Sequence, residues 1–335
     1  MTLKKLCTRC ILLVVFFCPA ALHAAEITPF YTQNQSPLIS IYGLPSIGEA
    51  AVMAPGKGAM RLTVDVANNY TTEQKGRESI LLDGESSRFT LHGRYGVGSR
   101  LEAGIEVPYI IIGGGFLDSF IEGYHHTFGF PNGGRDQAPQ NRLVYQYVKD
   151  GQMRLNMVQS GTGLGDVRLT GGWQFFKGEA KMPGEIALRA SLKLPTGDSD
   201  TLRGSGSTDL ALWLVGKKDF QMPLGCGSVF GGMGAMAMTG GKVLKDQQRP
   251  MVGFGTLGIG WSPLNWLALK VQADSHTPFY RDSDFRQVDG ASVQLTMGGT
   301  LAFSPQTALD IGVSEDLTVT TSPDVVFHLS LSHKF

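Results

Sequence analysis

The sequence is poor in charge and has no long apolar run after its first 25 residues. Lys, Arg, Asp and Glu make up 17% of the 335 residues, and 29 basic side chains balance 29 acidic ones. A formal net charge of zero offers no basic surface, so no nucleic-acid partner is expected. No later segment approaches the ~20 apolar residues of a membrane-spanning helix, which excludes a helical membrane protein.

Cysteine is almost absent from the same part of the chain. Cys7, Cys10 and Cys18 all lie in the first 25 residues, so only Cys226 remains beyond them. One cysteine cannot form an internal disulfide, and Cys226 is predicted to be a small apolar packing residue. Stability must therefore come from burial and hydrogen bonds.

The start of the chain has the pattern of a secretory signal. Basic residues precede a short apolar run, and small residues lead up to Ala24 and Ala25. This order predicts Sec-dependent export and cleavage near Ala24 or Ala25. The apolar run is too short to cross a bilayer as a helix.

Glycine is abundant, at 44 residues, and the apolar residues are dispersed in a period of two. Such alternation is typical of strands with one apolar and one polar face. Twelve segments show it, and they begin near residues 60, 89, 101, 167, 186, 210, 229, 251, 267, 293, 309 and 325. Each is close to the ~9–11 residues that cross a membrane at a tilt. The predicted fold class is all-β, a transmembrane antiparallel β-barrel of about 12 strands.

The connections between these segments alternate in length. Short ones that contain Pro or Gly lie at 97–99, 262–265 and 304–307. The longer, polar ones are 71–86, 113–163, 195–207, 240–250, 275–289 and 315–323. Membrane barrels have short periplasmic turns and longer outer loops, so both termini are predicted to be periplasmic.

The chain ends on an alternating strand and a bare aromatic residue. Phe327, Leu329 and Leu331 alternate with polar residues, and Phe335 comes last. Bacterial outer-membrane barrels typically end in this way, and their assembly machinery recognises the terminal signal. Phe335 is therefore the predicted membrane-assembly signal. The predicted location is the bacterial outer membrane, with outer-membrane lipid and the barrel assembly machinery as partners.

Two segments do not fit a plain barrel. Residues 26–58 precede the first clear strand, and they form either a plug in the lumen or a periplasmic tail with one extra strand. Residues 113–163 form the longest outer loop, in which the apolar spacing at 116–130 predicts a short helix. Further on, 143–148 and 153–158 flank a hairpin turn. This hairpin either extends outside the barrel or enters the wall and makes 14 strands.

Charged residues on neighbouring strands alternate toward the predicted lumen. The candidates for the lumen and its constriction are Arg88, Arg94, Arg100, Glu102, Glu106, Arg168, Arg189 and Lys193. They form either a salt-bridged ladder that fills the barrel or a constriction that selects solutes. Barrels of ~16–18 strands leave wide channels and small ones are filled by side chains, so about twelve strands predict a narrow or plugged conduit.

The long loop carries the candidate gate, because its amphipathic part could fold inward over the lumen. The gate candidates are Phe116, Asp118, Phe120, Glu122 and Arg135.

His328 and Ser330 have the spacing of the His-x-Ser pair of outer-membrane lipid hydrolases. An enzyme of that kind must present the pair to lipid. Here Leu329 and its apolar neighbours take the lipid side, which turns His328 and Ser330 toward the lumen. No catalytic residue is therefore predicted, and no cofactor or metal site.

Several short motifs carry a resemblance to known families. NQSP at 34–37, YGLP at 42–45, LDSFIE at 117–122 and FGFPNGGR at 128–135 resemble an uncharacterised family of Gram-negative outer-membrane β-barrel proteins, a domain of unknown function. GLGD at 163–166 and LPTGD at 194–198 are similar to outer-membrane channels of aromatic-compound degradation. The first resemblance implies no established activity, and the second implies a barrel.

The predicted organisation is a signal peptide at 1–25, an N-terminal segment at 26–58 and an outer-membrane barrel at 59–335. The predicted function is a narrow loop-gated channel for small solutes. The alternative is a closed structural or partner-binding barrel without transport, and a second alternative is a lipid-modifying enzyme.

Overall fold

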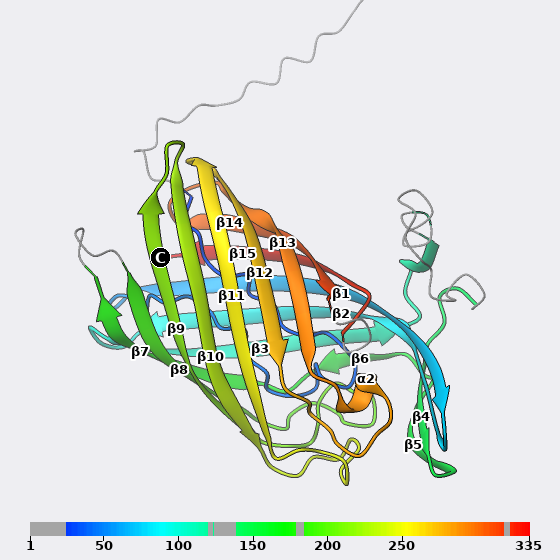
Figure 1. The fold of residues 1–335 in the computed structure, drawn as a ribbon. Coiled ribbons are helices and arrows are strands. Elements are labelled where there is room, and N and C mark those ends of the chain that lie inside the picture. Colours follow the sequence, from blue (N-terminus) through cyan, green and yellow to red (C-terminus); the bar gives the residue numbers. More distant parts are fainter. Residues whose placement is uncertain (1–24, 120–122, 124–138, 179–183, 318–321) are drawn as a thin grey trace, which may run out of the picture.

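Twelve strands close into an antiparallel barrel in which the first pairs with the last (Figure 1). The computed structural model describes residues 25–119, 123, 139–178, 184–317 and 322–335. The barrel strands are β1 Gly58–Lys75, β2 Glu78–Gly96, β3 Leu101–Gly113, β7 Arg168–Lys177, β8 Glu185–Lys193, β9 Asp209–Gln221, β10 Cys226–Met238, β11 Met251–Leu264, β12 Leu267–His276, β13 Ser292–Ala302, β14 Thr307–Asp316 and β15 Val325–Lys334. Each of the twelve alternating segments supplies one of these strands, so the predicted fold class is confirmed.

Three short strands lie beyond this ring. The hairpin of β4 (Val144–Lys149) and β5 (Gln152–Met157) pairs with β2 through β4, and it projects from one end of the barrel (Figure 1, lower right). The hairpin therefore extends outside, and the 14-strand alternative is wrong. The third strand, β6 (Gly161–Leu164), pairs with β3 and continues the line of β7.

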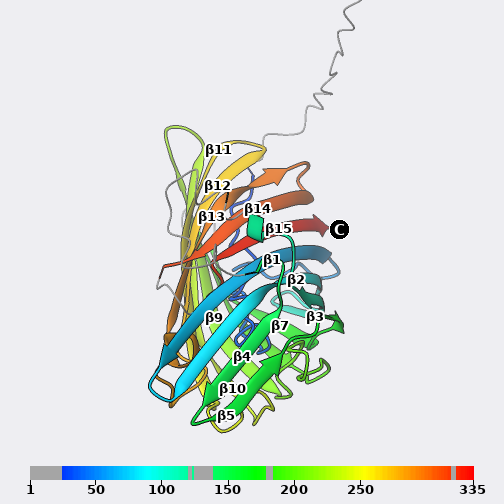
Figure 2. The same cartoon turned by 90° about the vertical axis from the view of Figure 1, so that its right-hand side faces the viewer.

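The first hairpin is longer than the sequence suggested. Residues 71–86 are not a loop, because β1 and β2 remain paired up to a turn at Gly76 and Arg77. Ile80 and Leu82 in this projecting part are buried where β2 pairs with β4. The projecting part of β2 thus gives β4 an edge to pair with, as Figure 2 shows from the side.

The two ends of the barrel differ. At the terminal end, Phe335 and the start of β1 lie beside the short connections 97–100, 265–266 and 303–306. At the loop end lie the longer connections 194–208, 239–250 and 277–291. The connection 277–291 includes the short helix α2 (Arg286–Asp289).

Some predictions concern residues that are not described. The signal peptide falls mainly on 1–24, and most of the helix expected at 116–130 falls on 120–122 and 124–138. In the described part of the chain, no helix has the length and apolar character needed to cross a membrane.

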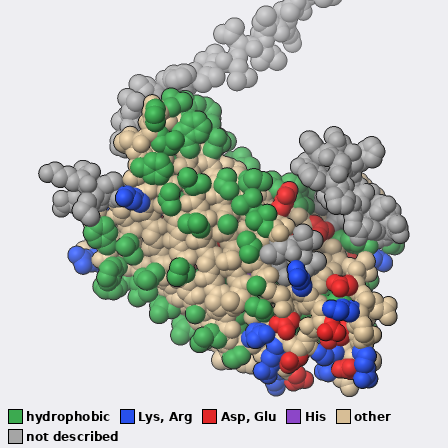
Figure 3. Space-filling view, in the orientation of Figure 1, with side chains coloured by type: hydrophobic (Ala, Val, Ile, Leu, Met, Phe, Trp, Pro, Cys, Tyr) green, Lys and Arg blue, Asp and Glu red, His purple; other side chains and the backbone are tan. Residues whose placement is uncertain are grey.

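The wall has an apolar outer face and a polar inner face. On β15, Leu329 and Leu331 are each 45% exposed, whereas His328 and Ser330 are each 1% exposed. Inward orientation of His328 and Ser330 is thus as predicted. Hydrophobic side chains spread over the wall, and charged ones gather toward the loop end (Figure 3). An exposed apolar band around a closed barrel is the surface that lipid covers.

Candidate functional site

Residues 26–57, here called the lumen segment, enter the barrel instead of adding a strand to its wall (Figure 1). A first pass runs from the terminal end, where Glu26 contacts Lys334, to the loop end. There the side-chain amide of Asn34 lies 2.9 Å from a ring nitrogen of His276.

The segment then turns at residues 36–42 and runs back. At the loop end, the Gly43 amide donates to Asp209 over 2.8 Å. At the terminal end, Pro55 forms a bridge with Gly96 next to the start of β1. The segment therefore crosses the lumen twice, as a loop that is joined to the wall at Gly58.

The inner wall supplies hydrogen bonds to the backbone of this segment. Before the bridge at Pro55 the described backbone of the segment has no sheet partner, and buried peptide groups need partners. Side chains of the wall and of connection 277–291 donate to its carbonyls: Lys270 to Thr28 (3.0 Å), Tyr280 to Leu38 (3.0 Å), Arg88 to Ser40 (2.6 Å), Arg168 to Leu44 (3.1 Å), Trp213 to Ile47 (2.9 Å), and Arg189 to Glu49 (2.7 Å) and Ala51 (3.1 Å). Other wall side chains accept from its amides: Gln272 from Phe30 (2.8 Å), Gln174 from Val52 (2.9 Å) and Glu102 from Met53 (2.7 Å).

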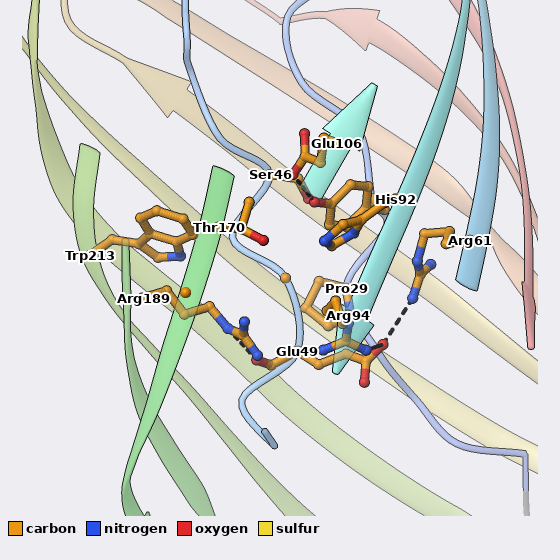
Figure 4. Close-up of a pocket in the computed structure, with 13 residues that line it drawn as sticks. Pro29, Ser46, Glu49, Arg61, His92, Arg94, Glu106, Thr170, Arg189 and Trp213 are labelled. Atoms are coloured by element: carbon orange, nitrogen blue, oxygen red, sulfur yellow. Dashed lines mark hydrogen bonds and ion pairs between the residues drawn. The ribbon is translucent and has the colours of Figure 1, made fainter. Parts of the chain in front are cut away.

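One carboxylate of the segment lies among cations of the wall. Glu49 Oε1 is 2.9 Å from Arg61 Nη2 and 2.8 Å from Arg94 Nη2, and Glu49 Oε2 is 4.0 Å from Lys334 Nζ. All but Lys334 are buried. Figure 4 shows Glu49 with Arg61 and Arg94, and Arg189 on the other side of the same stretch of chain.

Further ion pairs continue along the wall. Glu102 is 2.6 Å from Arg189 and 3.5 Å from Arg94. Glu106 is 3.0 Å from Arg168 and also accepts from the Tyr31 hydroxyl of the segment.

Nearer the loop end, Lys193 lies between Asp166 and Asp209. Buried charges of this kind are tolerated because each has an opposite charge or a hydrogen bond beside it.

Three small cavities between the segment and the wall have volumes of about 20, 10 and 20 Å³. A water molecule needs ~10–15 Å³ by this measure, so each cavity holds about one. Within the described residues, no group of three His, Cys, Asp or Glu is placed to hold a metal ion.

An aromatic group packs over the turn of the segment at the loop end. The Tyr42 ring lies 5.1 Å from Phe279 and 5.9 Å from Tyr280. Burial, together with the nearby Tyr42 hydroxyl, raises the pKa of Tyr280 well above its ordinary value. Its hydroxyl therefore stays protonated and can donate to Leu38 at any ordinary pH.

Most of the predicted lumen residues are brought together. Those buried on the inner face are Arg88, Arg94, Glu102, Glu106, Arg168, Arg189 and Lys193. Arg100 is not among them. It is exposed in the turn before β3, because that strand begins one residue later, at Leu101.

The two gate candidates that the structure describes, Phe116 and Asp118, do not belong to this group. Phe116 is 71% exposed, and Asp118 is buried, accepting from the Asn68 side chain (3.0 Å) and the Asn141 amide (2.7 Å). Phe120, Glu122 and Arg135 lie outside the described residues, so the loop gate stays a prediction.

Sequence reasoning did not single out Arg61 or Glu49. Arg61 carried a usable signal, because it lies between the outward Met60 and Leu62 on β1. Glu49 carried none, since the lumen segment has no periodicity.

Taken together, a closed barrel with an apolar outer face and a polar lumen defines the outer-membrane β-barrel class. The chain belongs to a family described as "Protein of unknown function (DUF3187)", whose model matches residues 5–335. The predicted membership of an uncharacterised barrel family is thus confirmed. No curated protein matches the chain.

Solved structures of outer-membrane proteins are similar to the chain at low sequence identity. The COG4313 outer membrane channel from Pseudomonas putida F1 is 12% identical, with a TM-score of 0.54, and the match covers 87% of this chain and 99% of that one. The NanC porin is 5% identical, with a TM-score of 0.44, and the match covers 82% of this chain and 100% of that one. The toluene transporter TbuX of Ralstonia pickettii is 10% identical, with a TM-score of 0.36, and the match covers 84% of this chain and 90% of that one. The first likeness establishes the fold, and none of them defines a solute.

Proposed function

We propose that this protein is a narrow outer-membrane channel for small solutes, and that the lumen segment closes it. The observation that carries the proposal is the double pass of residues 26–57 through the barrel, which leaves cavities of about one water each. In outer-membrane barrels the end with short turns faces the periplasm. The segment thus enters from the periplasmic side.

The nature of the filling supports a movable element. A small barrel can be filled by side chains of its own wall. Here the filler is a separate stretch of chain, joined to the wall at Gly58. It is held by hydrogen bonds and ion pairs, whose loss water can offset, and also by buried apolar side chains such as Phe30, Leu38 and Ile41. None of these contacts belongs to the pairing between wall strands, so the segment can leave the lumen while the β-sheet of the barrel stays intact.

The emptied lumen would be suited to water and polar solutes. The inward residues include the buried polar side chains of Thr63, Thr296, Thr300 and Ser330 as well as the ion pairs. Such a lining would hydrate once the segment withdrew. The competing function is a closed structural barrel, in which the same contacts hold the segment permanently.

Conductance in planar bilayers separates these functions. The proteins to compare are the full chain, a variant that lacks residues 26–53 and a variant that lacks 116–135. We expect brief, rare openings of the full chain, a sustained conductance without 26–53, and little change without 116–135. Heat-modifiable mobility in gels would check that each barrel is folded. A folded variant without 26–53 that stayed silent would favour the closed structural barrel, and large currents without 116–135 would favour the loop as gate.

A further inference from the structure

We infer that Arg61, Arg94 and Lys334 form a binding site for the carboxylate group of a transported solute, and that Glu49 occupies this site while the channel is closed. The inference rests on the proposed channel function and adds a class of solute, the small organic carboxylates. It also adds a reason for the segment to leave, since the solute and Glu49 would compete for one site.

The geometry is that of carboxylate recognition. Three strands of the wall, β1, β2 and β15, each contribute one cation. Arg61 and Arg94 reach the same oxygen of Glu49, at 2.9 and 2.8 Å, and Lys334 lies 4.0 Å from the other oxygen. Charge-assisted bonds from arginine are among the strongest that a carboxylate makes in proteins.

The wall does not neutralise these cations without Glu49. Arg61 would keep Asp310 at 3.6 Å, an acid that Lys270 contacts more closely at 2.9 Å. Arg94 would keep Glu102 at 3.5 Å, an acid that Arg189 contacts at 2.6 Å.

Arg61 and Arg94 thus each lose their closest carboxylate when Glu49 withdraws. The cations then outnumber the acids that remain beside them, and a lumen wall with an excess of one charge attracts ions of the opposite sign, so the vacated site would attract an anion.

A second polar group faces the same place. His92 lines the cavity that Glu49, Arg61 and Arg94 also line (Figure 4). It is buried, its ring stacks on Tyr31 at 4.9 Å, and neither ring nitrogen has a hydrogen-bond partner among the described residues. Buried polar groups in proteins are nearly always hydrogen-bonded, so His92 is available to a ligand. We assign it to polar groups of the solute beyond its carboxylate.

Chemical rescue of the full-length Glu49→Ala variant tests the site. The substitution removes the heavy atoms that acetate possesses, so free acetate can take the place of the missing carboxylate. The measurement is the midpoint of thermal unfolding, from heat-modifiable mobility in detergent. We expect a saturable rise with sodium acetate beyond that in sodium chloride of the same ionic strength. Wild type should show no such difference between the two salts.

The matched control is Glu26→Ala. Glu26 is the other carboxylate of the segment, but it pairs with Lys334 in an exposed position, so acetate should not act on it beyond chloride. If Glu49→Ala does not fold, Glu49→Gln keeps the volume and removes the charge. Its barrel should then be less stable than wild type, and wild-type channels should open more often in acetate than in chloride.

The outcomes also separate this inference from the proposed function. Equal effects of acetate and chloride on Glu49→Ala would overturn the carboxylate site, even if removal of residues 26–53 opened a pore. Acetate-specific rescue with a silent 26–53 deletion would uphold the site as a bound-anion site and refute the channel.

Discussion

Arg189 should control how often the channel opens. Its guanidinium, on β8, donates to the Glu49 carbonyl at 2.7 Å and the Ala51 carbonyl at 3.1 Å, and it pairs with Glu102 at 2.6 Å. Arg189→Ala removes both bonds to the returning pass of the lumen segment. Glu102 keeps Arg94 and the Met53 amide, so it is not left alone.

The size of the effect follows from these two bonds. A hydrogen bond to a charged group contributes about 1.5–3 kcal/mol net, so the two together hold the segment by about 3 kcal/mol or more. Every 1.4 kcal/mol is a factor of ten in an equilibrium. We therefore expect the open fraction of Arg189→Ala to be roughly 100-fold that of wild type.

Single-channel recording in planar bilayers measures this fraction directly. Arg100→Ala is the matched control, because Arg100 is exposed in a turn and its side chain forms no hydrogen bond or ion pair with the described residues of the segment. It should open as rarely as wild type. If folded Arg189→Ala also opened as rarely as wild type, the segment would not be held in the way described.

Two further predictions concern other positions. Tyr280→Phe removes the hydroxyl that donates to the Leu38 carbonyl, a bond worth about 1 kcal/mol, so the open fraction should rise about fivefold in the same recordings. An unchanged fraction would show that this hydrogen bond does not hold the segment. Phe335→Ala should lower the amount of protein assembled in the outer membrane, measured by fractionation and heat-modifiable mobility, while the protein that does assemble unfolds at nearly the wild-type temperature. Full assembly of Phe335→Ala would refute its role as the assembly signal.

The barrel could be predicted from the sequence because its signal is local. The period of two appears within each strand, and twelve such segments became twelve wall strands. The prediction of a loop at 71–86 failed. This part of the β1–β2 hairpin projects beyond the barrel and does not separate lipid from lumen, so its two faces do not differ in polarity as those of a wall strand do. Where the β4–β5 hairpin pairs depends on the free edge of β2, which the local sequence does not contain.

The candidate site was predictable only on the wall side. Residues such as Arg94 and Arg189 could be assigned to the lumen by alternation. Their partners in the lumen segment could not, because contacts such as Lys270 with Thr28 join positions 242 residues apart in a stretch without periodicity. Arg100 was wrongly assigned to the lumen because β3 begins one residue after it, at Leu101.

A reversible lock tests most directly whether the lumen segment closes the channel. A Cβ atom built on Gly43 would lie 3.1 Å from Cβ of Asp209, so a small shift permits a disulfide, which needs ~3.5–4.5 Å. Lys193 keeps Asp166 when Asp209 is replaced, and Cys226→Ser removes the competing thiol.

The test uses the Gly43→Cys/Asp209→Cys variant that also carries Cys226→Ser. Its currents in planar bilayers are compared between the oxidised and the reduced form. We predict that the oxidised protein stays closed and that the reduced protein opens at least as often as wild type. Equal currents from both forms, with the disulfide shown by mass spectrometry, would contradict the account.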